Sequence, residues 1–90
     1  MNLEVRHLKL VRAVSAAGSL TRAGAVLHLT QSALSHQLRD IESRLGARLF
    51  LRVGKRMVLT AAGERLLHSA NEVLTAIQRT EAGIRDLAGV

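Results

Sequence analysis

The 90-residue chain contains no cysteine and no proline. The lack of cysteine excludes disulfide bonds and thiolate metal sites, and the lack of proline is typical of a mostly helical chain. No apolar run approaches the ~20 residues of a membrane-spanning helix, and the N-terminus has no apolar signal-peptide core. We therefore expect a cytoplasmic protein that makes no membrane contact.

Length and composition indicate one small folded domain. A hydrophobic content of 48% argues against disorder, and 90 residues fit a single domain. A domain of this size buries a limited fraction of its surface, so association with a second copy would stabilise it.

Positive charge is concentrated in the first two thirds of the chain. Residues 1–60 contain ten Lys and Arg against three acidic residues, whereas residues 61–90 contain three Arg against four acidic residues, so the two segments carry net charges of +7 and −1. This distribution is typical of a polyanion-binding head on a neutral stem.

Residue patterns that would indicate catalysis or metal binding are missing. The four histidines show no i, i+4 pairing with one another or with a carboxylate cluster that would suggest a metal site. Ser35 and His36 are adjacent in the chain, so they do not face each other as a nucleophile and its base do, and no acid completes a triad. We expect neither an enzyme nor, in this domain, a metal or a cofactor.

Helical periodicity predicts a first helix over residues 3–17. Leu10 and Val14 share one face of this helix, and Leu8 points to the other side. Leu8 is there either an ordinary exposed leucine or the mark of a second buried surface. Gly18 is typical of the residue that ends a helix.

Two helices separated by a tight turn are predicted next, over residues 20–27 and 31–45. Ser19 and Thr30 are suitable N-cap residues for them. One side of the second helix is an apolar stripe. The opposite side is polar and cationic, and it carries Ser32, Ser35, His36, Arg39 and Ser43. A helix of this kind fits the major groove of DNA.

A basic β-hairpin is predicted after these helices. Short alternating apolar runs at 49–53 and 57–59 flank Gly54-Lys55-Arg56. A hairpin that follows a helix-turn-helix is called a wing.

Thr60 caps a fourth predicted helix that reaches to about Leu87. Its apolar residues recur every three or four positions, and roughly 28 residues at 1.5 Å each span about 42 Å. That length exceeds the core that the first sixty residues can offer, so the exposed end of the stripe needs a partner, most simply a second copy of the same helix. We expect the dimer interface to contain Leu8, Leu66, Ala70, Val73, Ile77, Ile84 and Leu87.

The run Leu27–Arg52 resembles the N-terminal DNA-binding domain of LysR-type transcriptional regulators, and the similarity extends from about Val5 to Ala70. The residues that carry it include Thr30-Gln31-Ser32-Ala33-Leu34-Ser35, Leu45-Gly46, Arg48-Leu49-Phe50, Arg52 and Leu59-Thr60-Ala61-Ala62-Gly63. The resemblance implies a linker helix that pairs antiparallel with its mate, and a regulatory domain beyond the end of this chain. The string TQSALSHQ is most similar to the subgroup that regulates methionine biosynthesis, which implies homocysteine as an effector bound by that further domain.

Two positions depart from the pattern of this family. Ser32 stands where many members have proline, and His36 stands where many have arginine. The resemblance implies that both positions read bases, so we expect a target preference that differs from that of the proline- and arginine-containing members.

The expected DNA contacts fall into two groups. Base edges would be contacted by Gln31, Ser32, Ser35 and His36; glutamine can bond adenine bidentately, and serine donates or accepts at a base or a phosphate. Phosphates or the minor groove would be contacted by Thr21, Arg22, Thr30, Arg39, Arg52, Lys55 and Arg56. The alternative is a solvated polar surface, in which the hairpin cations only keep a sheet edge from aggregating.

The fold prediction is a mainly α winged helix-turn-helix with a long C-terminal dimerisation (linker) helix. Residues 1–59 form the DNA-binding head, residues 60–90 form the linker helix, and the effector domain is absent from this chain. The predicted function is sequence-specific binding of double-stranded DNA, at an interrupted palindrome, by a homodimeric bacterial regulator of LysR type. We expect a nucleoid-associated protein whose full-length form is a tetramer and contacts RNA polymerase.

Two alternatives to this function stay open. One is another winged-helix regulator, such as the molybdate-sensing type, which shares the four-helix plan. The other is a protein-interaction module in which the last helix is a coiled-coil adaptor and the basic head docks an acidic protein. Salt-dependent binding to plain duplex DNA separates this second alternative from a DNA-binding protein.

Overall fold

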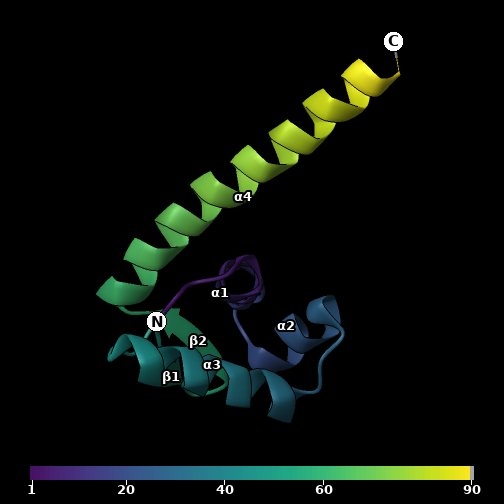
Figure 1. Ribbon diagram of the computed structural model, residues 1–90. Coiled ribbons are helices and arrows are strands. Elements are labelled where there is room, and N and C mark those ends of the chain that lie inside the picture. Colours follow the sequence, from purple (N-terminus) through teal and green to yellow (C-terminus); the bar gives the residue numbers. More distant parts are fainter. Residues whose placement is uncertain (90) are drawn as a thin grey trace.

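The computed structural model describes residues 1–89, which form four helices and one two-stranded sheet. The elements are α1 (Val5–Ala17), α2 (Leu20–Leu27), α3 (Gln31–Leu45), β1 (Phe50–Val53), β2 (Arg56–Leu59) and α4 (Ala61–Ala88). The first three helices and the hairpin gather into one head, and α4 crosses this head and projects beyond it (Figure 1). The prediction of a mainly α winged helix-turn-helix with a long C-terminal helix is confirmed.

Helix α1 begins two residues later than the sequence pattern predicts, because Glu4 is its N-cap. Glu4 has an extended backbone (φ −117°, ψ 162°), and its N–H donates to Nδ1 of His7 at 2.9 Å. Arg6 donates a hydrogen bond to the Glu4 carboxylate at 3.2 Å, and this bond, together with the charge of Arg6, lowers the pKa of Glu4.

A tight turn joins α2 to α3. His28 has a left-handed backbone (φ 58°, ψ 42°), which is uncommon for a residue other than glycine. The N–H of Leu29 donates to the carbonyl of Gly24 at 2.8 Å, and a Cβ placed on Gly24 would lie 2.6 Å from the carbonyl oxygen of Leu29. Position 24 therefore has no room for a side chain. Thr30 ends the turn, because its hydroxyl oxygen accepts the N–H of Ala33 at 3.1 Å and caps α3.

One hydrophobic core joins the three helices of the head to the start of the hairpin. Phe50, the only aromatic residue of the chain, is fully buried in it. The other buried members are Leu10, Val11, Val14, Leu20, Ala23, Leu34, Leu38, Ile41 and Leu49. Burial of this apolar surface orients the polar side of α3 outward.

The hairpin is antiparallel, and its register pairs Phe50 with Leu59 and Val53 with Arg56. The strand β2 begins one residue earlier than predicted, because Arg56 still pairs across the sheet. Between the strands, Gly54 has φ 64°, a conformation that favours glycine. The prediction of a wing is confirmed.

Two sets of hydrogen bonds anchor the hairpin to the helices. The N–H of Leu49 donates to the carboxylate of Glu42 at 2.7 Å, and β1 starts at Phe50, one residue later than predicted. On the other strand, the N–H of Met57 donates to the carbonyl of Gly18 at 2.9 Å. The hairpin is therefore tied to α3 on one side and to the α1–α2 connection on the other.

The first half of α4 packs on α1. Leu8, Ala70 and Leu74 form a second buried cluster, and Leu66 packs against both this cluster and the main core. The second buried surface predicted for Leu8 is present, but α4 of the same chain fills it. The assignment of Leu8 and Ala70 to a dimer interface is therefore corrected, because both side chains are already covered within the chain. Leu66 is only partly covered, and its place in a dimer interface stays a prediction.

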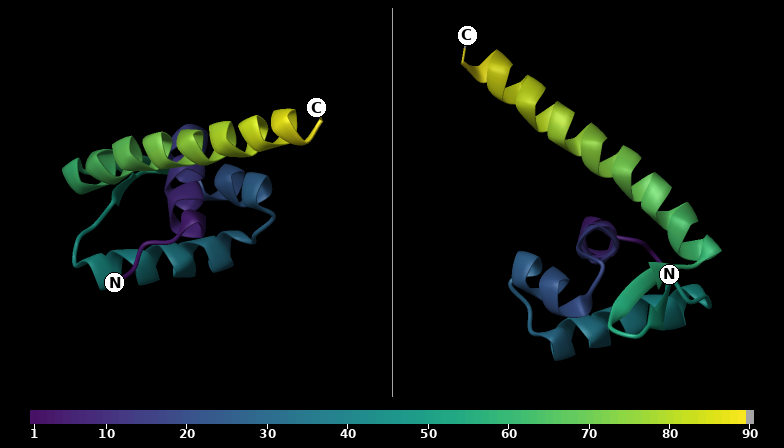
Figure 2. Two further views of the ribbon diagram at one scale, coloured as in Figure 1. Left: turned by 45° about the horizontal axis from the view of Figure 1, so that its top comes forward. Right: turned by 180° about the vertical axis from the view of Figure 1, so that it is seen from behind.

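The second half of α4 leaves the head. Both views of Figure 2 show its C-terminal end extending past the other elements. Ile77 is half-buried, whereas Val73, Ile84 and Leu87 are 42%, 60% and 77% exposed. These residues form an apolar strip that the head does not cover.

Candidate nucleic-acid interface

The N-terminal half of α3 presents a polar face to solvent. Leu34 lies fully buried on its inner side. The residues predicted to contact bases lie on its outer side, where Gln31, Ser32 and His36 are exposed and Ser35 is half-buried. The structure therefore brings all four candidates together on one helix.

Side-chain hydrogen bonds hold two of these four residues. Thr21 of α2 donates to Oε1 of Gln31 at 3.1 Å, and Nη2 of Arg39 donates to Oγ of Ser35 at 3.2 Å. Within residues 1–89, no side-chain hydrogen bond holds the other two candidates, Ser32 and His36. Gln31 and Ser35 are therefore held in place before any ligand binds, whereas Ser32 and His36 can still change their rotamers.

The N-terminus of α2 lies beside the start of α3. The hydroxyl of Ser19 accepts the N–H of Arg22 at 3.2 Å and caps the helix. The earlier N–H groups of the first turn have no intrahelical acceptor, so together with the helix dipole they favour a negative ligand. Arg22 is exposed there and adds a full positive charge.

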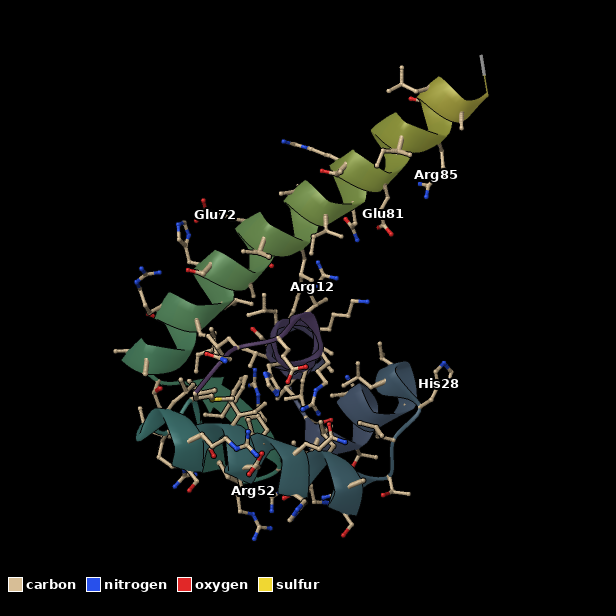
Figure 3. The ribbon with its side chains drawn as sticks, viewed as in Figure 1. Arg12, His28, Arg52, Glu72, Glu81 and Arg85 are labelled. Carbon is tan, nitrogen blue, oxygen red and sulfur yellow. The ribbon has the colours of Figure 1, made fainter. Side chains whose placement is uncertain are left out.

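The wing supplies three further exposed cations, Arg52, Lys55 and Arg56. In Figure 3 the side chain of Arg52 lies on the side of α3 that faces away from α4. The long helix therefore leaves this basic surface open.

A groove runs between the start of α2, the start of α3 and the wing; we call it the basic groove. It is lined by Thr21, Arg22, Gln31, Arg52, Lys55 and Arg56, among others. Four of these side chains are cations, and no acidic residue of the described chain lines the groove. Six of the predicted contacts, from three separate elements, thus converge on one surface with a positive potential. The other five predicted contacts do not line this groove; they are Thr30, Ser32, Ser35, His36 and Arg39.

A second groove separates α3 from the wing, and Arg39 and Arg52 line it together with Arg48. Sequence reasoning did not assign Arg48 a contact, although the residue stands in the Arg48-Leu49-Phe50 motif. Its Nε lies 3.5 Å from the carboxylate of Glu42, so part of its charge is neutralised. Glu42 was missed as well, because its partners are main-chain groups that no residue pattern marks.

The described residues contain no candidate metal site. Within residues 1–89, no three His, Cys, Asp or Glu side chains gather in a way that could hold a metal ion. His68 pairs with Glu72 at 2.9 Å on the exposed surface of α4, and His28 projects from the α2–α3 turn (Figure 3). None of the helices in this part of the chain has the length and apolar character needed to cross a membrane.

Comparison with known proteins identifies the family. Residues 5–64 match the family described as "Bacterial regulatory helix-turn-helix protein, lysR family". The chain belongs to the LysR family. This membership confirms the resemblance seen in the sequence and replaces the alternative of a molybdate-sensing winged-helix regulator.

Individual members of the LysR family are similar over nearly the whole chain. The HTH-type transcriptional regulator MetR of Salmonella typhimurium is 53% identical over 77 residues, which cover 86% of this chain and 24% of that protein. The MetR of Haemophilus influenzae is 47% identical over 88 residues, which cover 98% of this chain and 28% of that protein. This chain spans about a quarter of the length of these relatives.

Among solved structures, the CbnR_DBD–DNA complex has the same fold as this LysR-family chain. It is 34% identical, with a TM-score of 0.82, and the match covers 96% of this chain and 99% of that one. The arrangement of head, wing and long helix is therefore that of a LysR-type DNA-binding domain.

Proposed function

We propose that this chain binds double-stranded DNA as the DNA-binding part of a bacterial LysR-type transcriptional regulator. The observation that carries the proposal is the basic groove, where four cations from α2 and the wing lie beside the exposed polar start of α3. The names of the MetR relatives and the DNA-bound state of CbnR support it. A transcriptional regulator of this kind performs no reaction, so the chain is not an enzyme.

In this proposal α3 is the recognition helix and enters the major groove. Gln31, Ser32, Ser35 and His36 face the base edges, because they occupy the exposed side of the first turns of α3. Phosphate contacts on both sides of the DNA major groove position α3 and supply most of the binding affinity. They come from the backbone N–H of Thr21 and from Arg22, Thr30 and Arg39 on one side, and from Arg52, Lys55 and Arg56 in the wing on the other.

The exposed apolar strip of α4 supports a homodimer. Val73, Ile77, Ile84 and Leu87 would pack against the same residues of a second copy, since an uncovered apolar strip of this kind marks an interaction surface. An antiparallel pairing of two α4 helices places two heads on the half-sites of an interrupted palindrome.

The matched residues cover only about a quarter of the relatives' length, which supports a two-part organisation of the whole protein. We propose that residues 1–59 are the head and that the segment from residue 60 onward is the linker helix, of which α4 is the described part; Val90 lies outside the described residues. A regulatory domain would follow in the whole protein. We propose that the whole protein regulates methionine biosynthesis and binds homocysteine as its effector. We also propose that it assembles to a tetramer, contacts RNA polymerase, and is located in the cytoplasm on the nucleoid.

Fluorescence anisotropy with labelled duplexes tests DNA binding directly. A duplex selected by this chain from a random pool is compared with a scrambled duplex of equal length over a range of salt concentrations. We expect tighter binding to the selected duplex, and a logarithmic salt slope of about −0.9 for each phosphate neutralised. Binding to an acidic protein without any binding to duplex DNA would favour the adaptor alternative instead.

A further inference from the structure

The hydroxyl of Thr21 donates a hydrogen bond to Oε1 of Gln31 at 3.1 Å. Thr21 lies in the first turn of α2 and Gln31 is the first residue of α3, and both line the basic groove. Within residues 1–89 this is the one side-chain hydrogen bond between α2 and α3. It restrains a long, rotamer-rich side chain that otherwise loses its freedom only when a ligand binds.

The bond determines which end of the Gln31 amide faces outward. Because Oε1 is turned toward Thr21, the amide nitrogen and its two donors are presented to a ligand that lies against α3. A free glutamine can use its oxygen and its nitrogen together on adenine, whereas guanine presents two acceptors and thymine presents one acceptor in the major groove. Adenine also offers one acceptor, N7, but its neighbouring N6 amino group opposes the second amide donor, so a glutamine held by its oxygen is better matched to guanine or thymine.

The same bond constrains the role of Thr21. A threonine hydroxyl has one hydrogen, and Gln31 accepts it here, so this hydroxyl does not also donate to a phosphate. The backbone N–H of Thr21, in the first turn of α2, remains suitable for an anion. The side chain thus has a function different from the phosphate contact that the sequence suggested.

We infer that Thr21 is a positioning residue that sets base specificity through Gln31. By holding Oε1 it turns the amide donors toward the DNA, so that guanine or thymine is preferred over adenine at the contacted base pair. Thr21 itself touches no base. The inference rests on the proposed function, in which Gln31 faces the bases.

The test uses the 90-residue chain with Thr21→Val, Thr21→Ser, Gln31→Ala and the Thr21→Val, Gln31→Ala double substitution. Valine keeps the shape of threonine without the donor, and serine keeps the donor. Affinity is measured for four duplexes that differ only at the base pair whose preference Gln31→Ala removes, with a second half-site position as control. Circular dichroism verifies that each variant folds.

We expect Thr21→Val to reduce the preference for guanine or thymine over adenine roughly three- to tenfold, as the loss of one ordering hydrogen bond implies. Thr21→Ser should retain the preference, and the control position should not change. In the Gln31→Ala background, Thr21→Val should have no effect on the preference.

Several results would overturn the inference. They are a wild-type preference for adenine at this position, an equal loss for all four duplexes in Thr21→Val, and a change of preference that persists without Gln31. If Gln31→Ala removes the preference and Thr21→Val leaves it intact, the inference fails while the base contact of Gln31 stands. If Gln31→Ala removes no preference at any position, that part of the proposed function fails as well.

Discussion

The carboxylate of Glu42 accepts the backbone N–H of Leu49 at 2.7 Å and thereby joins α3 to the chain that enters the wing. The same oxygen lies 3.3 Å from the N–H of Phe50 and 3.5 Å from Nε of Arg48. Glu42 is only 7% exposed, so its carboxylate has little contact with water. Two main-chain N–H groups and one guanidinium replace the water molecules as its partners. The helix and the wing are held in one fixed arrangement as a result.

Glu42→Gln should lower the free energy of unfolding by about 1–3 kcal/mol, because the buried hydrogen bonds lose their charge and Arg48 loses its partner. Urea denaturation followed by circular dichroism measures the change. Glu81→Gln, on the exposed surface of α4 (Figure 3), is the matched control and should stay within about 0.5 kcal/mol of the wild type. Equal stability of the two variants would contradict the role assigned to the buried carboxylate.

Arg52→Ala should weaken binding to a selected duplex and to a random duplex by similar factors, since a phosphate contact carries no sequence information. The logarithmic salt slope should become shallower by about one unit. Arg85→Ala, at the far end of α4, removes the same charge away from the basic groove and should leave the slope unchanged. A normal slope for Arg52→Ala would remove this residue from the phosphate contacts.

Ile84→Lys or Ile77→Lys should dissociate the dimer, because each places a charge in the apolar strip of α4. Gln78→Lys introduces the same charge about 120° around the helix from Ile84 and should leave the dimer intact. Sedimentation equilibrium measures the association, and circular dichroism should show that the head stays folded, since its core does not include these residues. A wild-type chain that is monomeric at micromolar concentration would refute the proposed interface.

His36→Arg should change the preferred base at one half-site position, with a discrimination change of about 1–3 kcal/mol, because arginine bonds guanine through a rigid fork whereas histidine offers one nitrogen per base. His36→Ala should relax the same position and leave non-specific affinity nearly unchanged, since His36 is assigned a base contact and no phosphate contact. Selection from a random pool measures both effects. Identical preferences for the wild type and both variants would show that His36 reads no base.

Gly24→Ala should destabilise the chain by about 1–3 kcal/mol, because the new methyl group meets the carbonyl oxygen of Leu29 in the helix-turn-helix turn. Gly83→Ala is the contrasting variant, since a Cβ on Gly83 has no neighbour within 4 Å. It should stabilise α4 by about 0.5–1 kcal/mol through helix propensity. Thermal unfolding measures both changes, and a shift of the same sign in the two variants would argue against the tight turn.

Features set by neighbouring residues could be predicted from the sequence. Ser19, Thr30 and Thr60 each accept the N–H three residues ahead, and these caps placed three helix starts correctly. The polar face of α3 was predictable for the same reason, because helical spacing places Ser32 and His36 opposite the apolar stripe.

Features that join distant parts of the chain could not be predicted. Glu42 looks like any surface acid in the sequence, and only the folded chain brings the main chain of Leu49 to it. Leu8 was recognised as a buried position, yet nothing local shows that Ala70 of the same chain covers it rather than a second copy. The Thr21–Gln31 bond likewise depends on the angle between two helices, which residue spacing does not give.

The cluster of Leu8, Ala70 and Leu74 fastens the first half of α4 to the head, while the second half stays free. In a dimer joined through the free halves, the direction in which each head points is then decided within each subunit. The packing of these three aliphatic side chains would set the angle between α4 and the head, and therefore the number of base pairs between the two half-sites. A substitution that changes the size of one of these side chains would alter the distance between the two heads of the dimer, although none of the three contacts the DNA or the second subunit.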